Sequence, residues 1–285
     1  MLVEGMVVLV VDNGYGSFAV VREAVRGGPV VGWVDDEDIP VTNVVSDDGS
    51  NGSNQSYLDW HNEEEPVFWE IEQQTGKFCW VHAIVDTLEG LYAITHGERI
   101  KLSKQELVDN VFASNRDNYD EVTNTYSSPM EKGYHWIMAN GLSLEADYGS
   151  GKYEATIQEP KARIPGRQIL HLSGASLIND EHTILTELKK SPGAAVMSLA
   201  LDQMDLQDTN AVYSIASNTR QGQYHAIVVS GYDDTGSRNA YWVRDSMKSR
   251  TPNEGHYRVT RASGVQSGER NPIMYLIFPY GVSLR

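Results

Sequence analysis

The chain has 285 residues, of which 40% are hydrophobic and 22% are charged, and its longest apolar run, residues 6–11, is far too short to span a bilayer. This composition indicates a globular protein with a sizeable core rather than a disordered or membrane-spanning chain. The formal net charge of −16 repels phosphate backbones and therefore argues against a nucleic-acid partner.

The single cysteine, Cys79, excludes an internal disulfide and a cysteine-rich zinc site. Residues 1–11 have neither the basic start nor the small-residue cleavage site of a signal peptide. Both features favour an intracellular location. The sequons at Asn51 and Asn54 point the other way, so a secretory route stays open.

The first part of the chain is predicted to be an extension of about 55 residues. Residues 2–11 and 28–34 have the pattern of strands, with a short helical piece at 18–26 between them. A polar stretch rich in Gly, Ser, Asn and Asp follows at 45–56 and is typical of a linker. We therefore divide the chain into an extension, 1–55, and a main domain, 56–285.

The first half of the main domain is predicted to be helical. Apolar residues recur at helical spacing over 79–96, and Gly97 follows as a stop signal. A second helix is predicted after Ser103, which is spaced with Glu106 as a capping box. A third is predicted over 130–141, where an Asn-Gly pair ends it.

The second half is predicted to be mostly strands. After Pro165 there are short runs rich in Val, Ile and Tyr, separated by turn residues, with one helical segment at 180–190. Helices first and strands second favour an α+β protein with two segregated lobes. We place the helical lobe at about 56–165 and the β lobe at about 166–285.

Cys79 and His225 are the candidates for chemistry. Cys79 begins the first predicted helix, where the positive end of the helix dipole would favour the thiolate, the nucleophilic form of cysteine. His225 opens an apolar strand and lies within the spacing of roughly 130–150 residues that separates cysteine and histidine in papain-like enzymes. Taken singly, a free cysteine is more often buried filler and a histidine can be a core residue. Only the joint pattern indicates a site.

The sequence over 73–110 resembles the active-site region of papain-like cysteine peptidases. That family places a glutamine six residues before a Cys-Trp pair, followed by a helix and a Ser-x-Gln-Glu-Leu motif. The matching residues are Gln73, Cys79, Trp80, Glu89, Ser103 and Glu106. Further similar segments follow in the family's order: YLDW at 57–60, KGYHWIMANGLSLEADY at 132–148, YHAIVVSGYDDTGSRNAYWVRDS at 224–246 and NEGHYRV at 253–259.

The resemblance implies a papain-like two-lobe fold of the α+β class, a helical lobe followed by a β-barrel-like lobe, with the active site in the cleft between them. It implies a cysteine endopeptidase without a metal or organic cofactor, with peptide or protein substrates and protein inhibitors as partners, and with neither nucleic acid nor a membrane.

The resemblance also implies a role for each site residue. Cys79 would attack the peptide carbonyl, and His225 would carry the proton to the leaving amine. Gln73, selected over Gln74 by the six-residue spacing, would form the oxyanion hole with the backbone N–H of Cys79. Asp245 would orient the histidine. The substrate-binding residues implied are Gly133, whose backbone would pair with an extended substrate, Tyr134 and Ala226, which would line the specificity pocket, and Trp80.

Departures from the family pattern keep other functions open. The family's Asn-Ser-Trp is replaced by Asp245-Ser-Met247, so we expect water to reach the contact between Asp245 and the histidine. Another interpretation of Asp245 is a strand-end residue paired with Arg244 or Lys248. Lys77 stands where the family has a glycine, the family disulfides are missing, and the extension looks unlike an inhibitory pro-segment. The rivals are an impaired papain-fold protein that binds peptides or a partner protein, and a transpeptidase or other acyl-transfer enzyme using the same thiol.

Overall fold

The computed structural model describes residues 6–12, 17–23, 56–62, 67–114, 119–122, 124–199, 211–217 and 223–285. The chain divides into two compact units, Met1–Asn54 and Gln55–Arg285.

The N-terminal unit contains a β-hairpin. β1 (Met6–Asp12) pairs antiparallel with β2 (Ser17–Glu23), and Val11 lies opposite Phe18. The strand predicted within 2–11 is confirmed. The helical piece predicted at 18–26 is wrong over 18–23, where aromatic and β-branched residues instead extend and pair with β1; residues 24–26 lie outside the described residues. The strand expected at 28–34 lies outside the described residues, as does most of the linker expected at 45–56.

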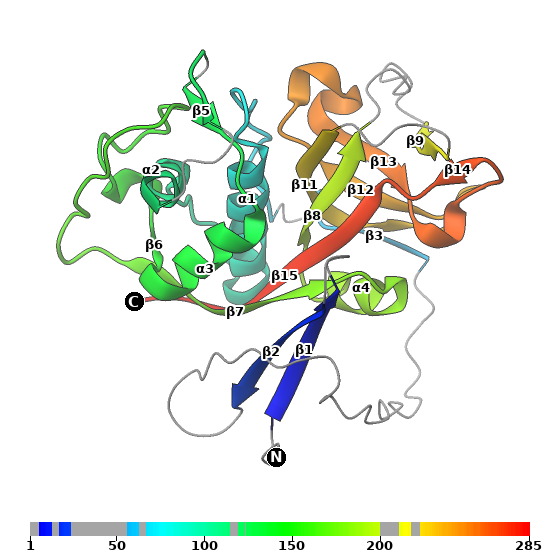
Figure 1. Cartoon of the computed structure of the whole chain (residues 1–285), viewed down its shortest axis with the longest axis horizontal. Helices are drawn as coiled ribbons and strands as arrows, with labels where there is room; N and C mark the ends of the chain where they lie inside the picture. Colours follow the sequence, from blue (N-terminus) through cyan, green and yellow to red (C-terminus); the bar gives the residue numbers. More distant parts are fainter. Residues whose placement is uncertain are drawn as a thin grey trace. The chain divides into compact units, whose positions relative to one another are not determined.

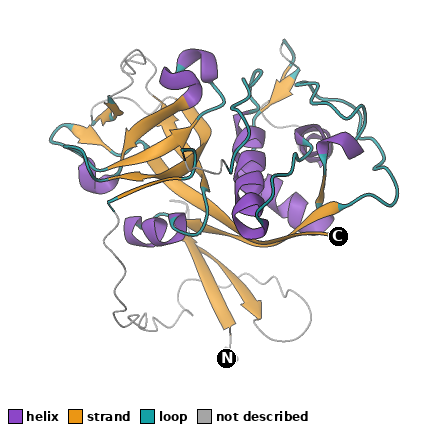
Figure 2. Cartoon of the chain, turned by 180° about the vertical axis from the view of Figure 1, so that it is seen from behind, coloured by secondary structure: helices purple, strands orange, loops and turns teal. Residues whose placement is uncertain are grey.

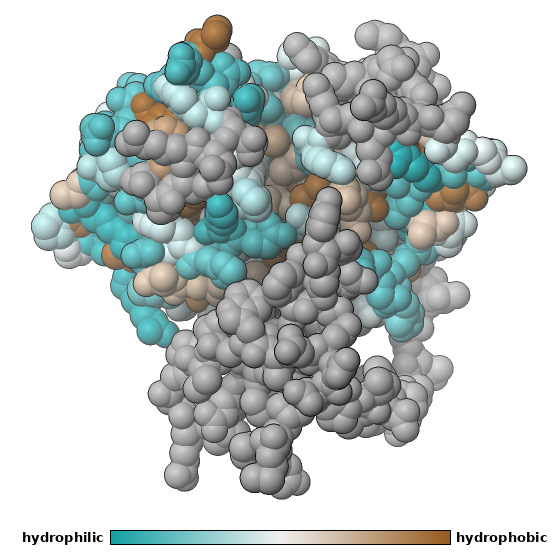
Figure 3. Space-filling model, viewed as in Figure 1, coloured by the Kyte–Doolittle hydropathy of each residue, from teal (hydrophilic) through white to brown (hydrophobic). Residues whose placement is uncertain are grey.

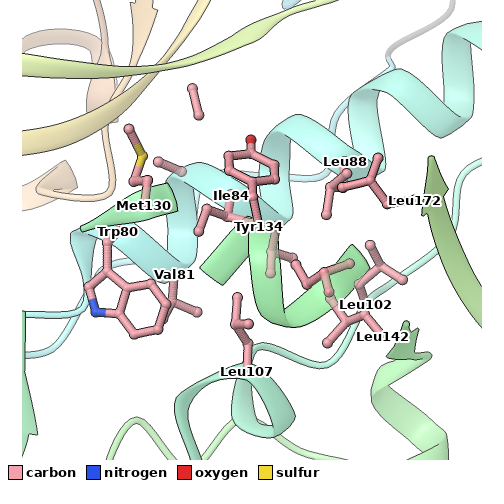
Figure 4. Packing of buried hydrophobic residues seen from close by; sticks show 14 of the residues in the cluster. Trp80, Val81, Ile84, Leu88, Leu102, Leu107, Met130, Tyr134, Leu142 and Leu172 are labelled. Carbon is pink, nitrogen blue, oxygen red and sulfur yellow. The ribbon is translucent and has the colours of Figure 1, made fainter. Parts of the chain in front are cut away.

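The helical lobe of the larger unit contains α1 (Cys79–His96), α2 (Lys104–Ser114) and α3 (Met130–Asn140). Gly97 ends α1 in the left-handed conformation, with φ of 72°, and its N–H donates to the carbonyl of Ala93, as its place in the sequence predicts. Between the helices lies a hydrophobic core whose labelled side chains are shown in Figure 4. These are Trp80, Val81, Ile84, Leu88, Leu102, Leu107, Met130, Tyr134, Leu142 and Leu172.

The predicted capping box of α2 is only half formed. Ser103 Oγ accepts the N–H of Glu106 at 3.1 Å. The carboxylate of Glu106 does not return to Ser103 but accepts the N–H of Ser143 at 2.7 Å and pairs with Arg163. The Glu106 side chain, which the sequence predicts to cap α2, therefore links α2 to the segment that follows α3.

The strands of the larger unit form a nine-stranded sheet beside the helices (Figures 1 and 2). Its order is β6 (Leu142–Ser143), β7 (Ile169–Ile178), β15 (Ile273–Leu284), β8 (Gly193–Leu199), β11 (Gln223–Asp233), β12 (Ala240–Arg244), β13 (His256–Thr260) and β9 (Val212–Tyr213), with β3 (Tyr57–Asp59) also paired to β11. The predicted α+β class is confirmed, and the described strands of this sheet do not close into a barrel.

Smaller elements complete the unit. They are the two-stranded sheets of β4 (Tyr119–Asp120) with β5 (Thr125–Tyr126) and of β10 (Ile215–Ala216) with β14 (Glu269–Arg270), helix α4 (Glu181–Leu188), and short 3-10 turns at Glu145–Asp147, Lys248–Arg250, Pro252–Gly255 and Ala262–Gly264. In the view of Figure 3 the described surface is largely hydrophilic, with scattered hydrophobic areas. Within the described ranges, no helix is long and apolar enough to cross a membrane.

Strand β11 is buried on both faces. Ala226 and Val228 belong to the cluster that includes the helices, while Ile227 and Val229 belong to a second cluster inside the β lobe. Successive side chains of a strand point to opposite faces, so a strand covered on both sides is apolar without alternation. This double burial accounts for the apolar run that follows His225, and it packs α1 against β11.

A buried ion network joins the helices to the sheet. Lys104 is 1% exposed, and its Nζ lies 3.3 Å from Asp86 on α1 and 3.1 Å from Glu72. The guanidinium of Arg244, at the end of β12, lies 3.7 Å from Asp86. Burial alone would raise the pKa of Glu72, but the charges and hydrogen bonds of Lys104 and Lys101 together outweigh it and lower that pKa to about 2. The carboxylates therefore stay ionised and depend on the buried cations.

We expect Lys104→Met to lower the free energy of unfolding by about 3–5 kcal/mol, because it leaves Asp86 as a buried charge without its closest cation. Urea unfolding measures the loss. The matched control is Lys101→Met, which removes a cation from the same Glu72 at a more exposed position and should cost about 0–1 kcal/mol. Equal losses in the two variants would contradict this account.

Candidate active site

Cys79 is the first residue of α1, and the structure places it beside His225 and Ala226 of β11. Phe78, immediately before it, is fully buried and anchors the start of the helix, while Cys79 itself is partly exposed. The thiol is hydrogen-bonded to the side chain of His225 and to the backbone N–H of Ala226. The only cysteine of the chain therefore meets a histidine from the opposite lobe.

Asp245 follows the last residue of β12 and holds the other side of the His225 ring. His225 Nε2 donates to Asp245 Oδ1 at 2.7 Å, and the two residues are 4% and 1% exposed. The expectation that water reaches this contact is wrong, because surrounding groups bury it although Met247 has replaced a tryptophan. The pairing of Asp245 with Arg244 or Lys248 is not observed.

The cations next to Asp245 in the sequence have other partners. The guanidinium of Arg244 donates to the carbonyl of Trp69 at 2.9 Å and lies beside Asp86, and Lys248 pairs with Glu254 at 2.8 Å. Neither cation pairs with Asp245, whose carboxylate instead accepts the ring N–H of His225.

The three side chains shift one another's pKa values. Burial alone would raise the pKa of the Cys79 thiol, but the hydrogen bond and charge of His225 bring it below its usual value. Burial alone would lower the pKa of His225, but the charge and hydrogen bond of Asp245, together with Cys79, raise it to about 10. Burial would raise the pKa of Asp245, yet the charge of His225 lowers it. The three shifts all favour the ionised forms: thiolate, imidazolium and carboxylate.

Gln73 and Gln74 join the loop before α1 to the loop after Asp245. The exposed side chain of Gln73 accepts the N–H of Ser249 at 2.8 Å and donates to the carbonyl of Gln74 at 3.1 Å. The side chain of Gln74 accepts the hydroxyl of Ser246 at 2.7 Å, and its backbone N–H donates to the Ser246 carbonyl at 2.8 Å. These bonds fix the position of the loop before Cys79 relative to the loop after Asp245.

Gly133, Tyr134 and Trp80 do not lie where their expected substrate-binding roles require. Gly133 is inside α3, so its backbone is helical and not extended, and a Cβ there would come within 2.5 Å of Ile84 on α1. Tyr134 and Trp80 are each 1% exposed in the helical core (Figure 4). The glycine lets two helices approach closely, a use that a sequence pattern does not separate from substrate pairing.

The other departures also have definite places. Lys77 directs its ammonium toward Asp120 at 4.0 Å, and its backbone N–H donates to Thr125 Oγ1 at 3.0 Å.

Among the described residues, no group of three or more His, Cys, Asp or Glu side chains is arranged to hold a metal ion.

Sequence reasoning missed Tyr257, whose hydroxyl donates to Asp245 Oδ2 at 2.8 Å. Its place in a short strand offered no signal, because the contact depends on the antiparallel pairing of β12 with β13.

Comparisons with known proteins point to one family. The sequence profile of the papain family cysteine proteases matches residues 55–277. Fruit bromelain of Ananas comosus is 28% identical over 206 residues, which cover 70% of this chain and 54% of that protein. Papaya proteinase 4 of Carica papaya is 26% identical over 193 residues, covering 67% and 51%. The chain therefore spans about half the length of these curated relatives.

Solved structures show the same fold. The digestive procathepsin L 3 of Tenebrio molitor larval midgut matches with a TM-score of 0.62 and 20% identity, covering 81% of this chain and 71% of that one. The Carica candamarcensis cysteine protease CMS1MS2, solved in complex with E-64, matches with a TM-score of 0.61 and 18% identity, covering 79% and 98%. The predicted papain-like fold is thereby confirmed.

We expect iodoacetamide to alkylate Cys79 rapidly at pH 6, well below the pKa of about 8.5 of a free thiol, because His225 stabilises the thiolate. The label is unambiguous, since the chain has one cysteine. His225→Ala should slow alkylation at pH 6 and restore an ordinary thiol titration, whereas the exposed His182→Ala should change nothing. A wild-type rate that follows an ordinary thiol titration would contradict the pairing.

Proposed function

This chain belongs to the papain family of cysteine proteases, and we propose that it is an endopeptidase that hydrolyses peptide bonds through Cys79 and His225. The observation that carries the proposal is the continuous hydrogen-bonded series from the thiol of Cys79 through His225 to the buried carboxylate of Asp245. A nucleophile bonded to a base, with the base oriented by a third group, is the arrangement that covalent acyl transfer requires.

The reaction follows from the charge states of the resting site. The Cys79 thiolate attacks the peptide carbonyl carbon, and the C–N bond then breaks as the His225 imidazolium gives its proton to the leaving amine. The acyl group remains as a thioester on Cys79. Neutral His225 then takes a proton from a water molecule that attacks the thioester, which releases the carboxylic acid product and restores the ion pair.

Negative charge on the substrate oxygen needs donors set in advance. The backbone N–H of Cys79 has no carbonyl partner within the helix, because it lies in the first turn of α1. We assign it to the oxyanion together with the amide of Gln73, whose orientation is supported by the bonds to Ser249 and Gln74. Loss of one such donor typically costs about 10²–10³ in rate. Ala226, whose N–H reaches Cys79, borders the same site.

Covalent labelling with E-64, the compound bound in the Carica candamarcensis relative, tests the nucleophile. E-64 should modify Cys79 and abolish hydrolysis of a peptide-amide substrate, and Cys79→Ser should neither be labelled nor hydrolyse the substrate. Labelling without turnover would favour the rival that binds peptides. Predominant transfer of the acyl group to an added amine, instead of to water, would favour the transpeptidase.

The carboxylate at Asp245 gives the pH dependence a definite direction. The active imidazolium is lost as the pH rises through the His225 pKa of about 10, so the alkaline limb of kcat/KM should lie near that value. Asp245→Asn keeps an acceptor but removes the charge, so its limb should move to lower pH. Asp245→Ala should lose more rate, because the ring is left unoriented. Identical profiles in all three proteins would contradict a role for Asp245.

A further inference from the structure

We infer that Tyr257 is a positioning residue of this site, whose hydroxyl holds one oxygen of Asp245 so that the other meets His225. The inference rests on the proposed protease function. The resemblance that implies roles for Cys79 and His225 assigns none to this tyrosine, whose contacts carry the inference.

The carboxylate of Asp245 is fully engaged on both oxygens. Oδ1 accepts the ring N–H of His225 and the backbone N–H of Met247, each at 2.7 Å, and Oδ2 accepts the Tyr257 hydroxyl at 2.8 Å. Asp245 is 1% exposed and Tyr257 is 3% exposed. A buried carboxylate oxygen without a donor is costly, and bulk water does not reach this one. Among the described residues Tyr257 is the donor observed on Oδ2.

The sheet determines where this hydroxyl lies. Tyr257 is opposite Val243 in the antiparallel pairing of β12 with β13, two residues before Asp245, and its ring packs in the core of the β lobe. The backbone N–H of Asp245 donates to the carbonyl of Gly255 at 2.8 Å, which fixes the turn beyond the strand. Strand pairing and core packing therefore fix the Tyr257 ring, and the turn fixes Asp245. The Tyr257 hydroxyl is directed at the Asp245 carboxylate as a result.

The chemistry of the donor suits an aspartate better than the asparagine usual in the family pattern. An ionised carboxylate has two acceptor oxygens, so a hydroxyl donor completes it. An asparagine that kept its oxygen toward His225 would turn its amide hydrogens toward Tyr257, and the hydroxyl would have to accept instead. Burial and the charge of Asp245 raise the pKa of Tyr257 well above its usual value, so it remains protonated as a donor. Asp245 and Tyr257 thus form a matched pair.

Removing the hydroxyl has a predictable direction. The groups facing Asp245 are His225 from β11, Cys79 from α1 and Tyr257 from β13, with Tyr213 of β9 next to Tyr257. The Tyr257 hydrogen bond lowers the pKa of Asp245, so its loss raises that pKa. Asp245 would then take up a proton at a higher pH as the solution is acidified. The charge of Asp245 raises the pKa of the Cys79 thiol, so with Asp245 neutral the thiolate should persist to lower pH.

The experiment is the pH dependence of Cys79 alkylation in the full chain, which needs no peptide turnover. Tyr257→Phe should move the acidic limb downward by up to about one pH unit, the size expected from a hydrogen bond to a charged group. Tyr241→Phe, a buried tyrosine of the same core, should leave it unchanged. In an Asp245→Asn background, adding Tyr257→Phe should not move the limb, because an amide does not titrate.

An unmoved limb in Tyr257→Phe, or the same shift in the asparagine background, would overturn the inference. If Tyr257→Phe does not fold, 3-fluorotyrosine at 257 keeps the shape with a stronger donor, and the limb should then move upward; no movement would count against the inference. Peptide hydrolysis and E-64 labelling without these shifts would refute the role of Tyr257 alone. The shifts without hydrolysis would refute the protease proposal alone.

Discussion

The packing of α1 against β11 is the contact on which the candidate site depends. Alternate side chains of β11 enter two different cores, so the strand cannot slide or rotate without exposing one of them. The first residue of α1 is Cys79, and His225 precedes the apolar run of β11. A packing interface between helix and sheet therefore sets the approach of the thiol and the imidazole. The Lys104 network, with Arg244 beside Asp86, reinforces the same interface with charge.

The charges of the site are favoured by their neighbours against the effect of burial. In surroundings poor in water, each charge of the series is acceptable only because its neighbour carries the opposite sign or donates a hydrogen bond. The imidazolium stabilises the thiolate, and the carboxylate stabilises the imidazolium. The carboxylate in turn depends on uncharged donors, the N–H of Met247 and the hydroxyl of Tyr257. The negative charge that Asp245 brings in place of an asparagine is thus stabilised by two hydrogen-bond donors.

Sequence patterns predicted the parts of this structure that depend on local periodicity or on the joint spacing of chemical groups. The bounds of α1 followed from helical spacing and Gly97, and the pairing of Cys79 with His225 was implied by the resemblance to papain-like enzymes. What depended on tertiary contact was missed. The close approach of α3 to α1 determines that Gly133 is a packing residue, and the sheet register determines that Asp245 is shielded by Tyr257.

The central claim is that His225 is an imidazolium held between a thiolate and a carboxylate. The most direct test is a ¹⁵N NMR titration of the His225 ring between pH 6 and 11. Both ring nitrogens should carry hydrogen at pH 8, and the proton should be lost near the pKa of about 10 that the charge of Asp245 sets against the effect of burial. A neutral His225 ring at pH 8, with a transition near the ordinary histidine value of about 6.5, would contradict the account.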